Sequence, residues 1–191
     1  FAVPPGLTPV IVKNIGASKL PDENYTYKAI VEKPFGTNNS SAIELNNILK
    51  NIFNEKEIFR IDHYLGKETV QNILFFRFAN SIFEPLWNNK YINNVQITVA
   101  EDIGIEHRGS FYEETGVIRD IVQNHMMQLI ALVAMEPPVG FQADLVRDEK
   151  VKVYKSIRPF TKEMAPDFVC GQYTANSKDD ISLKGYREEE G

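Results

Sequence analysis

Several features that would place a chain in a structural class are missing from this sequence. Cys170 is the only cysteine, so no internal disulfide can form and a reducing, cytoplasmic setting is expected. No apolar run approaches the roughly 18 residues that a membrane helix needs. Residues 1–5 lack the basic region and the cleavage site of a secretory signal. These absences predict a cytoplasmic protein without a membrane partner.

Sequence signatures of common cofactor sites are also missing. There is no G-x-G-x-x-G, so the chain carries no dinucleotide fingerprint of its own. Gly104 and Gly109 have the spacing of a P-loop, but Ser110-Phe111 follows where Lys-Ser/Thr is required. No H-E-x-x-H or Cys/His cluster indicates a metal, and none is expected. The first residue is Phe1 rather than Met, so we expect the chain to begin inside a longer protein.

Composition fits an ordinary globular protein. The 191 residues are 43% hydrophobic and 25% charged, which argues against general disorder. The net charge of −5 disfavours binding to nucleic acid or to an anionic membrane, because such surfaces need a basic stripe. A small anionic substrate is still compatible with this charge, since a few lysines in a pocket can bind one phosphate.

The first third of the sequence predicts a crossover unit of a parallel sheet. An apolar run at 28–31 leads to Pro34, which ends a strand because proline lacks the ladder donor. Ser41 and Glu44 have capping-box spacing, and apolar residues at helical period follow as far as Asn54. Residues 57–61 predict a second strand. Strand, helix and strand at this spacing indicate that residues 1–62 close an α/β domain.

The remaining sequence predicts an α+β arrangement over residues 63–191. Helical patterns cover 67–80 and 115–135, and the second is stopped by Pro137-Pro138. Alternating β-branched and polar residues predict strands at 95–100 and 151–154. The polar tail from Lys162 gives no clear pattern.

A polar run follows the second predicted strand at residues 60–68 (Arg-Ile-Asp-His-Tyr-Leu-Gly-Lys-Glu). Strand ends that lead into helices are where α/β sheets bind ligands. His63 and Lys67 are four residues apart, so one helical turn would place them on one face, with the Tyr64 hydroxyl nearby. These groups suit a phosphate, whereas the carboxylate of Asp62 would repel one. A solvated turn without function explains the run about equally well.

His125 lies on the apolar stripe of the predicted helix 115–135. On spacing alone a core histidine is the more common explanation. The functional alternative is a general base at the floor of a cleft, which needs a partner to fix its tautomer. Asp120 is a poor partner, because five residues of an α-helix place it about 140° from His125. The orienting carboxylate would have to come from another segment, and Asp62 is a candidate.

Two further positions are weaker candidates. Glu101 and Asp102 follow the predicted strand 95–100, where carboxylates could accept hydrogen bonds from sugar hydroxyls. An acidic surface turn is the simpler explanation for them. Lys33 precedes Pro34 at the end of the first strand, where it faces either a cleft or water.

The chain carries a series of motifs in a fixed order, at residues 32–36 (Glu-Lys-Pro-Phe-Gly), 60–68, 77–80 (Arg-Phe-Ala-Asn), 119–125 (Arg-Asp-Ile-Val-Gln-Asn-His), 134–138, 147–151, 171–173 and 185–186. In this order and spacing they resemble the glucose-6-phosphate dehydrogenases over nearly the whole chain, and the run at 60–68 is the most specific. The resemblance implies that residues 1–62 are the C-terminal part of an NADP-binding Rossmann-like domain. It also implies that 63–191 begin an α+β domain with a large antiparallel sheet, for substrate binding and oligomerisation.

The resemblance assigns roles around the reacting carbon. His125 is similar to the base that takes the proton from the C1 hydroxyl as hydride leaves C1. Asp62 is similar to the carboxylate paired with that base, and Glu101 and Asp120 are similar to the acceptors of sugar hydroxyls. An ideal α-helix would point Asp120 away from His125, so the resemblance implies a distorted helix or a wide pocket.

The resemblance also assigns the phosphate and the cofactor. His63, Tyr64 and Lys67 are similar to the phosphate-binding group. Lys33 is similar to a lysine that touches both the sugar and the cofactor, and Pro34 is expected beside the cofactor. The implied reaction oxidises glucose 6-phosphate to 6-phosphogluconolactone with NADP, at the entry of the pentose phosphate pathway. A cytoplasmic homo-oligomer (dimer or tetramer) is implied.

Two alternatives stay open at this point. A non-catalytic sugar-phosphate-binding relative would keep the fold. However, a protein that had lost catalysis would be expected to carry substitutions at some of the candidate site residues, and all six are present: Lys33, Asp62, His63, Lys67, Asp120 and His125. A phosphosugar isomerase would use the same base and phosphate site without a nicotinamide. It would leave the preceding crossover unit unexplained.

Overall fold

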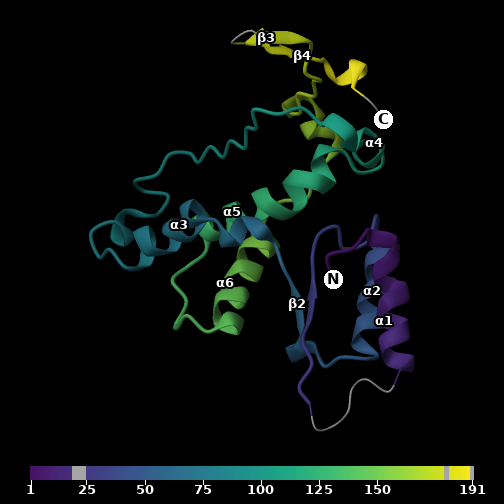
Figure 1. The fold of residues 1–191 in the computed structure, drawn as a ribbon. Helices are drawn as coiled ribbons and strands as arrows, with labels where there is room; N and C mark the ends of the chain where they lie inside the picture. Colours follow the sequence, from purple (N-terminus) through teal and green to yellow (C-terminus); the bar gives the residue numbers. More distant parts are fainter. Residues whose placement is uncertain (19–24, 179–180, 190–191) are drawn as a thin grey trace. The chain divides into compact units, whose positions relative to one another are not determined.

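The computed structural model describes residues 1–18, 25–178 and 181–189. The chain divides into two compact units, Phe1–Tyr64 and Leu65–Gly191 (Figure 1). Each unit has its own hydrophobic core. In the described part of the chain, no helix combines the length and the apolar character needed to cross a bilayer.

The first unit is a strand–helix–strand crossover preceded by a helix. Its elements are the 3-10 turn η1 (Pro5–Leu7), α1 (Thr8–Ala17), β1 (Ala29–Val31), α2 (Asn39–Lys50), η2 (Glu55–Glu57) and β2 (Ile58–Arg60). The two strands pair in parallel with Ala29 opposite Ile58 and Val31 opposite Arg60. Parallel neighbours need a crossover connection, and α2 supplies it. The predicted parallel crossover is thereby confirmed.

Helix α2 begins earlier than the sequence pattern suggested. Asn38 is the N-cap, and its side chain accepts a hydrogen bond from the Ser41 backbone N–H at 2.9 Å. The Ser41 hydroxyl accepts in return from the Asn38 N–H at 3.0 Å. Ser41 therefore occupies the N3 position of the capping box rather than the N-cap, because asparagine caps at least as well as serine.

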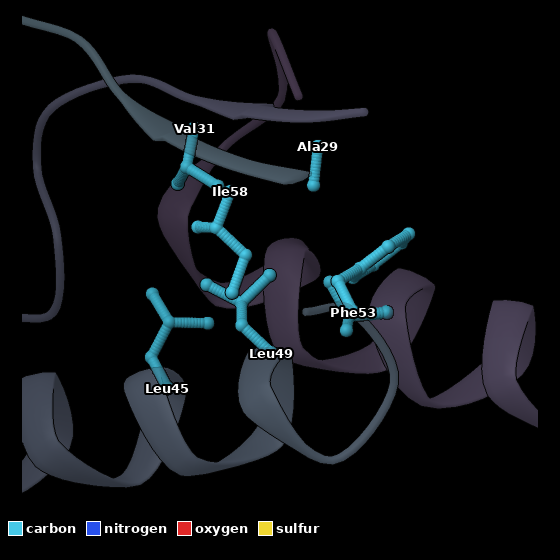
Figure 2. Close-up of a cluster of buried hydrophobic side chains, with 7 residues drawn as sticks. Ala29, Val31, Leu45, Leu49, Phe53 and Ile58 are labelled. Carbon is cyan, nitrogen blue, oxygen red and sulfur yellow. The ribbon is translucent and has the colours of Figure 1, made fainter. Parts of the chain in front are cut away.

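The core of the first unit lies between α1, α2 and the two strands. Leu45, Leu49 and Phe53 come from α2 and the turn after it, and they pack on Ala29, Val31 and Ile58 of the strands (Figure 2). Val12 of α1 completes the buried set. The apolar positions of α2 recur at helical spacing, so one face is buried while Ile43 on another face is 53% exposed.

The second unit is mainly helical. Its elements are η3 (His63–Gly66, which straddles the division), α3 (Glu68–Phe78), η4 (Glu84–Leu86), η5 (Glu106–Arg108), α4 (Gly109–Val117), the π-helix η6 (Ile118–Met126), α5 (Met127–Ala134), α6 (Ala143–Ser156), η7 (Lys162–Asp167), β3 (Asn176–Lys178), β4 (Ile181–Leu183) and η8 (Tyr186–Glu188). Strands β3 and β4 form an antiparallel pair. Val70, Leu132, Met135 and Val153 place the core among α3, α5 and α6.

Buried Arg77 ties α3 to the end of α5. Its Nη1 donates to the carbonyls of Leu132 and Val133, both at 2.9 Å, and Nη2 forms an ion pair with Glu84 at 3.2 Å. The Trp87 indole N–H donates to the same Val133 carbonyl at 2.7 Å. The last carbonyls of a helix have no partner within it, so these donors satisfy them and fix the position of α5.

Two predicted strands of this unit are wrong. Residues 151–154 belong to α6, where Val153 is the buried residue and ion pairs at helical spacing join Arg147 to Asp144 and Lys152 to Glu149. A four-residue alternation cannot outweigh the helical pattern of the whole segment. Residues 95–100 form no regular secondary structure. Both sheets among the described residues form without this segment, and strand residues need backbone partners.

Residues 117–134 are helical, as predicted for 115–135, but they do not form one regular α-helix. Gly116 has φ 68° and ψ 166°, which breaks the helix inside α4. The π-helix η6 follows, and an α-helical ladder resumes only in α5. The backbone conformation at Gly116 is open almost only to glycine, so the break is encoded by that residue.

Leu49→Ala tests the packing of the first unit. Leu49 is fully buried, so truncation should cost about 2–5 kcal/mol through lost contacts and the cavity left behind. Ile43→Ala on the same helix is the matched control and should change stability by about 0.5 kcal/mol or less, because Ile43 is exposed. Thermal unfolding of the intact protein measures both, and equal destabilisation would contradict the assigned core.

Gly116→Ala tests the helix break. A Cβ at Gly116 would meet no atom within 4 Å, so any cost is backbone strain alone, about 1–3 kcal/mol. Gly171→Ala is the control, because that Cβ also has open space and Gly171 has no left-handed φ. Gly116→Ala should melt at a clearly lower temperature than Gly171→Ala. An unchanged melting temperature for Gly116→Ala would show that the helix does not need the break.

Candidate active site

The parallel pairing of the first unit gathers candidate residues at one edge of its sheet. Lys33 and Pro34 follow β1, and Asp62 and His63 follow β2. The Ile61 N–H donates to the Val31 carbonyl at 3.0 Å, which extends the pairing past the end of β2. Because parallel strands end at the same edge, both polar segments leave the sheet where α/β proteins bind nucleotides.

The segment after β1 lies tightly against the start of α2. Gly36 has φ 77°, and a Cβ there would lie 2.5 Å from the Ala42 backbone nitrogen. Only glycine allows both this conformation and this approach. The close contact fixes where the Lys33–Pro34 segment leaves the sheet.

The turn after β2 is shaped by Asp62. Its Oδ1 accepts a hydrogen bond from the Tyr64 backbone N–H at 3.0 Å, a side-chain turn typical of aspartate. The rings of His63 and Tyr64 meet edge to face, with centroids 5.2 Å apart. Tyr64 is buried and His63 is exposed, so the turn presents the imidazole outward.

Arg60 anchors the end of β2 next to this turn. Its Nη1 donates to Glu55 Oε1 at 2.8 Å, and its guanidinium lies 5.5 Å from the centre of the Phe35 ring. The hydrogen bond from Arg60 lowers the pKa of the Glu55 carboxyl. Since Phe35 belongs to the segment after β1, Arg60 links the two strand ends that carry candidate residues.

Lys67 does not share a helical turn with His63, contrary to the expectation from their spacing. Residues His63–Gly66 form a 3-10 turn, and Lys67 is the N-cap of α3 in an extended conformation (φ −73°, ψ 131°). Its carbonyl accepts from the N–H groups of Val70 and Gln71, while its side chain is exposed. A cation at the start of a helix, beside unsatisfied N–H groups, favours an anion such as phosphate.

His125 and Asp120 both lie in the π-helix η6. A π-helix closes its hydrogen bonds between residues five apart, so residues separated by five positions lie about one turn apart on the same side. The angle of about 140° expected for an ideal α-helix therefore does not apply to this pair. His125 is 1% exposed and Asp120 is half-buried. π-Helical turns are frequent at functional sites, and this one carries a buried histidine and a half-buried aspartate.

Tyr112 of α4 is part of the surroundings of Asp120 that the sequence did not reveal. Burial raises the pKa of the Tyr112 phenol, and the negative charge of Asp120 raises it further. The phenol also packs edge to face on Tyr186, whose hydroxyl donates to Glu113. This hydrogen bond raises the pKa of Tyr186 to about 12. No motif or periodic pattern around Tyr112 could have identified it.

The remaining assignments stay predictions. Glu101 is exposed in a segment without regular secondary structure. The pairing of Asp62 with His125, and the joint phosphate site of His63, Tyr64 and Lys67, are predictions as well. The geometry within each unit is compatible with the assigned chemistry: an imidazole and a carboxylate on η6, and polar strand ends at the edge of the parallel sheet.

Two family models match the chain in succession. Residues 1–72 match the model described as glucose-6-phosphate dehydrogenase, NAD binding domain. Residues 74–191 match the model described as glucose-6-phosphate dehydrogenase, C-terminal domain. Together they cover nearly the whole sequence.

Individual proteins show the same similarity. The glucose-6-phosphate 1-dehydrogenase of Borreliella burgdorferi is 50% identical over 163 residues, covering 85% of this chain and 34% of that protein. The Chlamydia pneumoniae enzyme of the same name is 47% identical over 195 residues, covering 100% of this chain and 38% of that protein. This chain therefore spans between a third and two fifths of these relatives.

A solved structure described as glucose-6-phosphate dehydrogenase in complex with its substrate glucose-6-phosphate superposes with a TM-score of 0.86 and 41% identity. It covers 99% of this chain and 38% of that chain. The Mycobacterium avium glucose-6-phosphate 1-dehydrogenase gives a TM-score of 0.73 and 44% identity, over 81% of this chain and 33% of that chain. With both family models matched in succession, this chain belongs to the glucose-6-phosphate dehydrogenase family.

Proposed function

We propose that this chain is the central part of an NADP-dependent enzyme that oxidises glucose 6-phosphate to 6-phosphogluconolactone, the entry reaction of the pentose phosphate pathway. Relatives named for this activity are identical to the chain at about half of the aligned residues, and the alignments cover most of this chain. The observation that carries the proposal is buried His125 in a π-helix with Asp120, because it supplies a base beside an acceptor for sugar hydroxyls.

His125 is the proposed general base. A neutral imidazole takes the proton of the C1 hydroxyl while the hydrogen on C1 leaves as hydride, so that C1 becomes the carbonyl of the lactone. The nicotinamide accepts the hydride when the cofactor is bound. Asp62 holds the imidazole in the tautomer that leaves one nitrogen free to accept, and it stabilises the imidazolium that forms.

The other candidates position the two ligands. His63, Tyr64 and Lys67 bind the phosphate, and Glu101 and Asp120 accept hydrogen bonds from the sugar hydroxyls. Lys33 contacts sugar and cofactor, and Pro34 lies beside the cofactor. The exposed ammonium of Lys67 at the N-terminus of α3 and the position of Lys33–Pro34 after a parallel strand support these roles.

The wider organisation follows the family. We propose that residues 1–62 belong to the NADP-binding Rossmann-like domain and that 63–191 begin an α+β domain with a large antiparallel sheet. NADP rather than NAD, a cytoplasmic location and a homo-oligomer (dimer or tetramer) belong to the same proposal. The parallel β1–β2 pair and the NAD binding domain match at residues 1–72 support the first part of it.

His125→Asn in the intact protein should lower kcat by about 10³-fold with little change in KM for glucose 6-phosphate, because asparagine cannot take the proton. NADPH absorbance at 340 nm measures the rate. His107→Asn is the matched control, since His107 is exposed on η5, and it should keep the wild-type kcat. A wild type that binds the sugar phosphate but makes no NADPH would replace the enzyme proposal with a non-catalytic binding role. A wild-type kcat in His125→Asn would show that His125 is not the general base.

Lys67→Gln should raise KM for glucose 6-phosphate about 10–100-fold, the loss expected for one hydrogen bond to a charged group. Activity towards unphosphorylated glucose should not change, because the variant removes only a phosphate contact. Lys90→Gln, another exposed lysine of the same unit, is the control and should leave both substrates unaffected. A parallel loss of activity on glucose and on glucose 6-phosphate would contradict a phosphate role for Lys67.

A further inference from the structure

Asn124 lies beside the candidate base, and its side chain crosses the backbone of the π-helix. Its Nδ2 donates to the Arg119 carbonyl at 2.9 Å, and its Oδ1 accepts from the His125 backbone N–H at 2.7 Å. Only one orientation of the carboxamide satisfies both groups, because a backbone N–H can only donate and a carbonyl can only accept. The bond to the His125 N–H is part-buried, whereas the bond to the Arg119 carbonyl is exposed.

The bond from Asn124 is one of several around η6 that join residues five positions apart. The Arg119 Nη1 donates to the Glu114 carbonyl at 3.2 Å, on the far side of the Gly116 break. At the end of η6, the Met127 N–H bonds to the carbonyls of Val122 and Asn124. Side chains therefore supply hydrogen bonds where the ordinary α-helical ladder is interrupted. A side chain inserted into that ladder is a recognised cause of helix distortion.

We propose that Asn124 is a positioning residue, whose carboxamide holds residues 118–126 in the π-helix and so keeps Asp120 on the same side as His125. The proposal rests on the proposed function of His125 and Asp120. Without the carboxamide, both of its hydrogen bonds are lost, and the segment relaxes towards the ordinary i→i+4 ladder. In that ladder Asp120 points about 140° away from His125.

The relaxation would move Asp120 rather than the end of the helix. Leu132 and Met135 are buried in the core of the second unit, and the side chain of Arg77 bonds to the carbonyls at the end of α5. These contacts hold α5 in place. The residues before it, next to the break at Gly116, are the part that can turn.

Asn124→Leu in the intact protein tests the proposal, because leucine has the same branching and the same number of side-chain heavy atoms, favours an α-helix and makes no side-chain hydrogen bond. We expect kcat/KM for glucose 6-phosphate to fall about 10²-fold, the effect of a misplacement near 1 Å. KM should rise together with the fall in kcat, since Asp120 contacts the sugar. Simple loss of folded enzyme would lower kcat at an unchanged KM. Gln123→Leu, an exposed amide one position earlier, is the control and should behave as the wild type.

A crystal structure of Asn124→Leu gives a readout that does not depend on activity. Conversion of residues 118–126 to i→i+4 hydrogen bonds, with the kinetic changes above, supports the proposal. A retained π-helix, or wild-type KM and kcat, overturns it. If Asn124→Leu does not fold, Asn124→Asp decides by the same two measurements, because it keeps the acceptor for His125 and loses the donor to Arg119. If the wild type makes no NADPH, the proposed function fails, and the crystal structure still decides whether Asn124 holds the π-helix.

Discussion

The break at Gly116 is the constraint on which the candidate active site depends. A continuous α-helix from α4 to α5 would place Asp120 and His125 on different sides. Instead, the left-handed backbone at Gly116 ends one helical stretch, and the π-helix η6 carries both residues before α5 begins. The strained stretch is held from its other end, where α5 packs in the core and bonds to Arg77. Irregular backbone at a functional site is thus stabilised by regular packing beyond it.

The first unit contributes by a different principle. Its strands are parallel and adjacent, so the polar segments that follow them leave the sheet at one edge without any special side-chain contact. Arg60 then fixes the end of β2 through its ion pair with Glu55 and its contact with the Phe35 ring. Gly36 fixes the segment after β1 through its close approach to α2. Topology sets the location of these candidates, and a few local interactions set their exit from the sheet.

Helices and strands were predicted best where a segment carried a single periodic pattern of apolar residues. The crossover around α2 followed from helical spacing, although Asn38 rather than Ser41 caps the helix. Prediction failed at 151–154, where a short alternation lay inside the helical pattern of α6, and at 95–100, where strand propensity had no backbone partner among the described residues. The motifs identified His125 and Asp120, but ideal helix geometry misplaced them because it contains no π-helix. Tyr112 and the hydrogen bonds of Asn124 could be found only from coordinates.

The most direct test of the central claim is a crystal structure of the intact protein with glucose 6-phosphate bound. We expect one imidazole nitrogen of His125 within about 2.6–3.2 Å of the C1 hydroxyl oxygen, the distance that proton abstraction needs. The Asp62 carboxylate should accept from the other nitrogen. A bound sugar whose C1 hydroxyl faces another residue, with His125 packed away from it, would contradict the assignment of the base.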